Sequence, residues 1–196
     1  PFLWRPLAWK RLLAYSSLEH MGVLALGIGF GHRLAVAGVV LHVAGHALAK
    51  SLGFLAAIPL LRYQRTAGSR PARGVARTSP AIAGAMGVSL VSLAGLPPSP
   101  IFFSEVFVLL GGVLAGNTAV VAVAAVLLGL GFLGLAHTLI ESMVGRSLGR
   151  RPQGRRGTRQ ILGLTVAAGA GLLALSAAAY LLPDSGLVEA IVRWSG

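Results

Sequence analysis

The sequence predicts an all-α fold, a bundle of about six transmembrane helices that forms a single membrane domain over residues 1–196. Three observations lead to this prediction. Of the 196 residues, 55% are hydrophobic and only 11% are charged, and the mean hydropathy of +0.78 is too high for a soluble domain of this length. Several apolar runs approach the roughly 20 residues that cross about 30 Å of hydrocarbon. The 27 glycines suit such a bundle, because small residues let helix backbones approach closely in lipid.

Apolar runs and the residues that interrupt them place the helices along the chain. We predict spans at 12–29, 34–61, 80–96, 101–115, 118–144 and 161–182. The chain contains no cysteine, which excludes disulfides and thiolate metal sites. It opens on Pro1 without a methionine or a signal-peptide pattern, and we therefore expect it to be a piece of a longer protein.

Two loops, 62–79 and 145–160, carry most of the arginines, a bias that favours the cytoplasmic side. Six full crossings would place the loops on opposite sides of the membrane. Either the fourth run does not cross fully, or a helix is broken at 96–100, or one loop violates the charge bias. The net charge of +12 lies in these clusters between apolar runs. It therefore indicates contact with lipid headgroups and not with nucleic acid.

A proline cluster interrupts the middle of the chain. Pro97, Pro98 and Pro100 remove backbone donors and force the chain out of helix. Unwound backbone at membrane depth is tolerated only inside protein or beside a water-filled cavity, as at the ion sites of transporters. A tight turn at the membrane surface explains the cluster equally well.

Lysine is rare in this chain. Of the 17 basic residues, 15 are arginine, and the two lysines are Lys10 and Lys50. Arginine keeps its proton in proteins, whereas a lysine in apolar surroundings can alternate between charged and neutral forms. Lys50 lies deep in the second span, and we interpret it as a proton carrier. Lys10 lies at the start of the first span, where snorkelling to the membrane surface is an equally good explanation.

Lys50 shares its helix face with two histidines. His42, His46 and Lys50 follow one another at intervals of four residues, which stacks them on one face over roughly 12 Å. Imidazole accepts and donates protons through its two nitrogens, so this ladder indicates a proton relay through intervening waters. Zinc binding by the two histidines is the competing hypothesis, but the sequence supplies no nearby third ligand, and we predict no metal site.

Glu105 follows the proline cluster early in the next apolar helix, where a carboxylate needs a partner. We expect it to face Lys50 through water and to exchange protons with it. A favourable interaction with the helix dipole is the alternative. Secondary candidates are two pairs that suit local hydrogen-bonded couples within their spans: Glu19 with His20, and His137 with Glu141.

Three stretches resemble one family of membrane proteins. Residues 10–22 read KRLLAYSSLEHMG, residues 41–50 read LHVAGHALAK, and residues 95–105 read GLPPSPIFFSE. In this order they resemble the antiporter-like subunits of respiratory complex I, of membrane-bound hydrogenases and of multisubunit sodium/proton antiporters. The form of the first stretch, with GLAH at 134–137, is most similar to the hydrogenase-4 component F branch.

The resemblance implies a fold of about fourteen helices in two inverted halves, of which this chain carries the second. It implies a multi-pass subunit of the cell (inner) membrane that holds no cofactor or redox centre and translocates protons, driven by electron transfer elsewhere in a large complex. By the same resemblance, Lys50 is the central carrier, Glu105 is the exit-side group, and Lys10 with the two histidines connects them. The other half supplies one half-channel, without which the chain is not expected to translocate protons.

We therefore expect a non-redox, proton-translocating subunit of a hydrogenase-4-like or NADH:quinone oxidoreductase-like complex. Its expected partners are other membrane subunits, the lipid bilayer and protons. A subunit of a sodium/proton antiporter is one alternative, and a non-conducting scaffold, in which the charges only hold helices together, is another. An enzyme with its own active site is not expected, because the sequence shows no set of nucleophile, base and acid and no cofactor motif.

Overall fold

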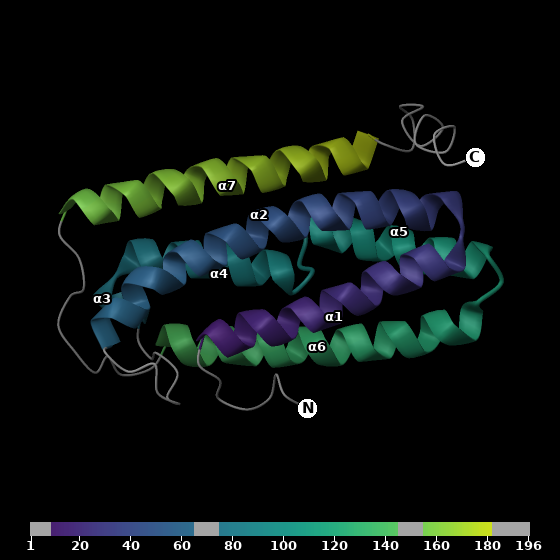
Figure 1. Cartoon of the computed structure of the whole chain (residues 1–196), viewed down its shortest axis with the longest axis horizontal. Coiled ribbons are helices and arrows are strands. Elements are labelled where there is room, and N and C mark those ends of the chain that lie inside the picture. The colour runs from purple at the N-terminus through teal and green to yellow at the C-terminus, as the bar shows by residue number, and fades with distance from the viewer. Residues whose placement is uncertain (1–8, 65–74, 145–154, 182–196) are drawn as a thin grey trace.

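The computed structural model describes residues 9–64, 75–144 and 155–181, and within these ranges all regular structure is helical (Figure 1). The helices are α1 (Trp9–Phe30), α2 (Arg33–Gln64), α3 (Val75–Thr78), α4 (Pro80–Leu93), α5 (Pro100–Leu114), α6 (Thr118–Val144) and α7 (Arg155–Leu181). The predicted all-α bundle is confirmed, and most predicted bounds agree to within three residues. Helix α7 begins six residues earlier than predicted, and the short α3 inside the first basic loop was not predicted.

Only four of these helices are long and apolar enough to cross a membrane alone. They correspond to α1, α2, α6 and α7. Helices α4 and α5 have 14 and 15 residues, so at 1.5 Å per residue each is only about 22 Å long. Neither covers the roughly 30 Å of a hydrocarbon core. The prediction of six separate spans is therefore wrong for this pair.

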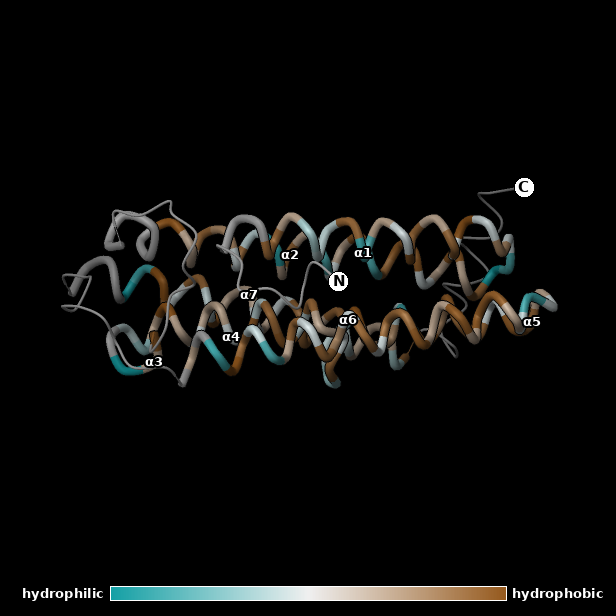
Figure 2. Tube along the Cα trace, turned by 90° about the horizontal axis from the view of Figure 1, so that it is seen from below, coloured by the Kyte–Doolittle hydropathy of each residue, from teal (hydrophilic) through white to brown (hydrophobic). Residues whose placement is uncertain are grey.

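Helices α4 and α5 are instead the two halves of one broken helix. They follow one another along the long axis of the bundle in both views (Figures 1 and 2). If α4 and α5 together make one crossing, only two crossings separate the basic loops, this pair and α6. The C-terminal ends of α2 and α6 and the start of α7 accordingly lie at the same end of the bundle (Figure 1). Both loops thus obey the charge bias, which predicts that this end is cytoplasmic.

The break is built from sequence signals at each side. Gly95 ends α4 with a positive φ of 66°, and the amides of Gly95 and Leu96 return to the carbonyls of Ser92 and Val91. This pattern is a Schellman motif, which needs glycine at its left-handed position. Ser99 then caps α5 by accepting from the Phe102 amide at 3.2 Å, and a proline follows at the first helical position. The prolines therefore mark a discontinuous helix, as one of the two interpretations predicted.

Helix α2 occupies the centre of the bundle and contacts α1, α4, α5 and α7. Its face toward the broken helix carries Gly38, Gly45 and Gly53, at intervals of seven and eight residues that keep them on one side. A Cβ at Gly38 would lie 2.8 Å from the carbonyl oxygen of Ser104. A Cβ at Gly45 would lie 2.8 Å from the ring of Pro100. These glycines allow the two backbones to pack directly, which brings the side chains of α2 and α5 together.

We expect Gly38→Ala to destabilise the bundle by about 1–3 kcal/mol, because the added methyl meets backbone that cannot move aside. Gly84→Ala in α4 is the matched control, since a Cβ at this exposed position meets nothing within 4 Å. Its stability should be unchanged or slightly higher. Thermal unfolding of the two purified variants measures the difference, and equal losses would contradict this account of the α2 face.

Candidate functional site

Three histidines from two antiparallel helices meet inside the bundle, and we call His20, His42 and His46 the histidine cluster. His20 comes from α1 and the other two from α2. The ring centroid of His20 lies 5.0 Å from that of His42 and 4.8 Å from that of His46. His20 and His42 are fully buried, and His46 is half-buried. Burying three polar rings in an apolar bundle costs free energy unless they are hydrogen-bonded, and such groups within membrane spans often mark a functional site.

The hydrogen bonds of the cluster fix the tautomer of each linked ring. Ser104 of α5 donates its hydroxyl proton to the Ile101 carbonyl at 2.6 Å, so it accepts from His42 Nδ1 at 2.8 Å. Neutral His42 then has its lone pair on Nε2, which accepts from His20 Nδ1 at 3.0 Å. His20 is left with a lone pair on Nε2, a buried atom with no hydrogen-bond partner among the described residues. The cluster therefore offers a proton acceptor at one end and an ordered donor chain behind it.

Lys50 lies beside the cluster, one turn beyond His46 on α2. Its side chain is buried. Its ammonium group donates to the Leu13 carbonyl and to Ser16 Oγ at 2.6 Å. Ser16 in turn precedes His20 by one helical turn on α1. The amine is thus held on the face of α1 that carries His20.

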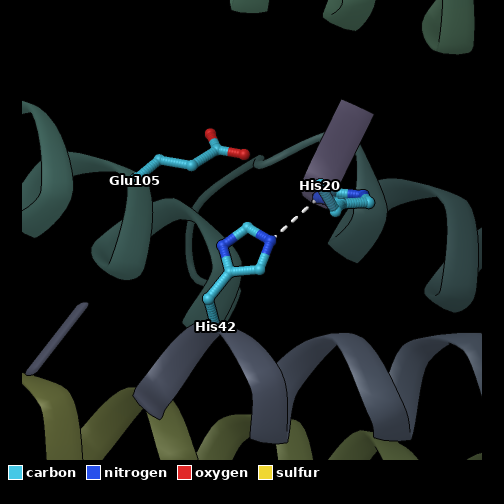
Figure 3. Close-up of side chains that lie close together, drawn as sticks. All are labelled: His20, His42 and Glu105. Atoms are coloured by element: carbon cyan, nitrogen blue, oxygen red, sulfur yellow. Dashed lines mark hydrogen bonds between the residues drawn. The ribbon is translucent and has the colours of Figure 1, made fainter. Parts of the chain in front are cut away.

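Glu105 extends from α5, the second half of the broken helix, to His20 and His42 of the cluster. Its carboxylate and the rings of His20 and His42 each offer one atom within 4.8 Å of the others, and they converge on one point in Figure 3. A Cβ at Gly95 would lie only 2.6 Å from Glu105 Oε2. The glycine that ends α4 therefore also makes room for the carboxylate.

The carboxylate of Glu105 borders an open cavity of about 350 Å³ between α1, the broken helix and α6. At about 30 Å³ for each molecule, this volume has room for roughly ten waters. Glu19 lines the same cavity, and its Oε2 is buried with no hydrogen-bond partner in the described part of the chain. Its carboxylate packs against Gly131 of α6, where any Cβ would overlap it. Two carboxylates thus border one cavity beside the histidine cluster.

The structure gives Lys50 and Glu105 different direct contacts. The ammonium group of Lys50 bonds Leu13 and Ser16, whereas the carboxylate of Glu105 lies near His20 and His42. The expected approach of Glu105 to Lys50 through water stays a prediction. His20 also bonds His42 and not its neighbour Glu19, since consecutive helical residues point about 100° apart.

The remaining candidates stay predictions. Lys10 belongs to α1, but its side chain lies outside the described residues. His137 is exposed and Glu141 is half-buried, both near the end of α6. Sequence reasoning missed Ser16 and Ser104 as members of the site. Their signals were the four-residue step from Ser16 to His20, and the place of Ser104 directly before Glu105.

The sequence predicts that Lys50 carries protons, and on that prediction we expect Ser16→Ala to slow proton transfer from Lys50 about three- to tenfold, because it removes a hydrogen bond that orients the amine. Ser17→Ala is the matched control, since the Ser17 hydroxyl also bonds the Leu13 carbonyl but no bond joins it to Lys50 among those described. Proton uptake by vesicles that contain each variant compares the two. A loss of similar size in both would refute a specific role for Ser16.

Comparison with known proteins identifies the family. A family model described as "NADH:quinone oxidoreductase/Mrp antiporter, TM" matches residues 6–132, which is more than half of the chain and includes the histidine cluster, Lys50 and Glu105. The chain belongs to this family. We call it the antiporter family below. Because the family is transmembrane and the described residues hold four candidate spans, the chain is a multi-pass membrane protein.

Relatives within the antiporter family come from three kinds of complex. A hydrogenase-4 component F homolog of Methylacidiphilum infernorum is 37% identical over 51% of this chain and 21% of its own length. A Na(+)/H(+) antiporter subunit from Alkalihalophilus pseudofirmus is 34% identical over 59% of this chain and 24% of its own length. An NADH-quinone oxidoreductase subunit from Desulforudis audaxviator is 37% identical over 58% and 23%. The chain thus spans about a fifth to a quarter of the length of these relatives.

The fold of the antiporter family is also seen in a solved structure. A chain of the Mrp complex from a Dietzia species superposes with a TM-score of 0.68. It covers 92% of this chain and 44% of its own length at 22% identity. The match therefore supports the expected antiporter-like fold. Two of these relatives are named as subunits, the third is a homologue of a hydrogenase component, and the solved chain belongs to a complex.

Proposed function

We propose that this chain forms a proton path within an antiporter-like subunit of a hydrogenase-4-like or NADH:quinone oxidoreductase-like complex. The subunit carries no redox centre of its own, and electron transfer in partner subunits drives the protons. The observation that supports this proposal is a succession of titratable side chains from Lys50 through the histidine cluster to Glu105. Such a succession is costly in a bilayer and useful for moving protons.

The order of groups suggests how a proton moves. Lys50 releases a proton toward the neighbouring imidazoles, with Ser16 holding the amine in place. When His20 Nε2 takes up a proton, His20 Nδ1 passes its own proton to His42 Nε2 over 3.0 Å. His42 then transfers a proton to Glu105, whose nearest ligand atom lies within 4.8 Å, a gap that one water bridges.

Glu105 completes the proposed path by exchanging its proton with water in the adjoining cavity. Return of the histidine rings to their starting tautomers prepares the cluster for the next proton. Glu19 is a secondary member of the proposal, because its carboxylate lines the same cavity as Glu105. Lys10, His137 and Glu141 remain secondary members of the proposal on the sequence alone.

Sodium/proton antiport is the second candidate function, and the similarity to the Na(+)/H(+) antiporter relative favours it. The two functions differ in whether protons move without sodium. We expect liposomes that contain the complete complex to take up protons in sodium-free buffer when electron transfer is started, with a fluorescent pH probe as the readout. A sodium ionophore should leave this uptake unchanged. Uptake that requires a sodium gradient would contradict the main proposal in favour of the antiporter.

A further inference from the structure

The convergence of His20, His42 and Glu105 resembles a chelate that lacks its ion. Each side chain comes from a different helix, α1, α2 and α5, and the three potential ligand atoms lie within 4.8 Å of one another (Figure 3). We propose that these three residues bind one divalent transition-metal ion, with Zn²⁺ the preferred occupant, and that the ion competes with protons for the same nitrogen and oxygen atoms, so that bound metal blocks the proposed path. The ligands differ from the His42 and His46 pair considered from sequence, because His46 is not among the converging groups.

The ligand types select the metal. Two imidazole nitrogens and one carboxylate oxygen form a common set for zinc, with a fourth position left for water. Mg²⁺, Ca²⁺ and Na⁺ prefer oxygen ligands alone and fit poorly here. Zinc bonds of about 2.0–2.2 Å place ligand atoms about 3.3 Å apart in a tetrahedron. The observed separations of at most 4.8 Å therefore need only side-chain rotations to close.

The surroundings orient the ligands as metal sites require. Ser104 accepts from His42 Nδ1, which fixes that ring and leaves its Nε2 lone pair directed at the cluster. His20 already has one buried nitrogen, Nε2, with no partner among the described residues. When the His20 proton moves from Nδ1 to Nε2, Nδ1 gives up its bond to His42 and becomes free to bind the metal. This shift leaves the number of protons on the neutral rings unchanged.

Charge and access also favour a cation. Glu105 and Glu19 line the same cavity, and once deprotonated the two carboxylates balance a divalent ion. The cavity of about 350 Å³ opens beside Glu105 and gives a hydrated ion a route to the ligands. Two nearby groups, His46 and Lys50, would disfavour a cation when they are protonated. The ammonium group of Lys50 is bonded to Leu13 and Ser16 and not to the proposed ligands.

Cobalt tests the site directly, because Co²⁺ replaces Zn²⁺ in such sites and absorbs visible light. We expect Co²⁺ added to the purified complex carrying His20→Cys to give a sulfur-to-cobalt charge-transfer band that the unsubstituted complex lacks. The chain has no other cysteine, and subtraction of the two spectra removes the absorption of partner subunits. Zn²⁺ should abolish the band. If Co²⁺ alone gives no such band in a fully assembled His20→Cys complex, the proposal is overturned.

A second measurement covers the unsubstituted ligands. Zn²⁺ bound per complex, measured by equilibrium dialysis, should fall by one ion in His20→Ala and in Glu105→Ala. His32→Ala is the matched control, since His32 lies in the turn before α2 and bonds the Leu34 amide, and zinc binding should not change. Equal stoichiometry in all four proteins would exclude the site. These readouts do not depend on proton transport, so they stand apart from any failure of the proposed function.

Discussion

Lys50→Met is expected to reduce proton translocation to background, a loss of about 100-fold or more, while the complex still assembles and transfers electrons. Methionine has similar length but neither accepts nor releases a proton, so the path is cut at its proposed carrier. Lys50 is buried and held by two hydrogen bonds from α1, and it lies one turn from the histidine cluster. Proton uptake by proteoliposomes, with electron transfer measured in the same sample, gives the result.

Lys50→Arg separates conduction from a scaffold role. Arginine keeps the positive charge of this position, but it does not release its proton in a protein. If the charge only holds helices together, Lys50→Arg should assemble and function normally while Lys50→Met fails to assemble. If Lys50 conducts protons, both variants should assemble and neither should translocate protons. An active Lys50→Arg complex would rule out Lys50 as the carrier.

The parts of this site that share one helix followed from the sequence, and the parts that cross between helices did not. The spacing of His42, His46 and Lys50 predicts one face of α2, because helical periodicity is local. The packing of Glu105 against the cluster depends instead on how α5 crosses α2. That crossing is set by Gly38 and Gly45, whose partners lie on the far side of the break. The sequence pattern alone does not give the distance between α2 and α5.

The broken helix shows the same difference: the sequence predicted where the break lies but not how the helices on either side of it cross the membrane. Glycine, proline and serine around residue 95 to 100 predict a break, and the caps confirm it. Whether the two helices on either side cross separately or as halves of one span depends on their direction after the break. In the structure the two helices have 14 and 15 residues, each too short to cross the membrane alone, and so they are halves of one span. The shared end for both basic loops then follows from counting crossings.

His20 illustrates why a correct candidate received the wrong partner. Adjacent acidic and imidazole residues suggest a couple, but neighbouring helical side chains point in different directions. His20 therefore faces α2, whereas Glu19 faces Gly131 of α6 and the cavity. The two side chains thus face different neighbours of α1, His20 toward α2 and Glu19 toward α6. Helical geometry alone would have favoured Ser16 as the residue on the His20 face.

Glu105→Gln is the second substitution with a large expected effect. Glutamine keeps the shape of the side chain, and with it the contact above Gly95, but it does not titrate. We expect proton translocation to fall about 100-fold, as for loss of a group that both accepts and donates a proton. The complex should assemble normally, because the amide still offers polar atoms to the cavity. Proton uptake and electron transfer in proteoliposomes measure both consequences.

Glu105→Asp gives the contrast that identifies the cause. Aspartate retains a titratable carboxyl but shortens the reach toward His20 and His42, whose nearest atoms already lie up to 4.8 Å away. Transport should therefore survive at a reduced rate, well above that of the glutamine variant. If the carboxylate served only to fill space above Gly95, glutamine would be the better substitute and the order of activities would be reversed. The ranking of these two variants thus decides whether protonation or shape makes residue 105 necessary.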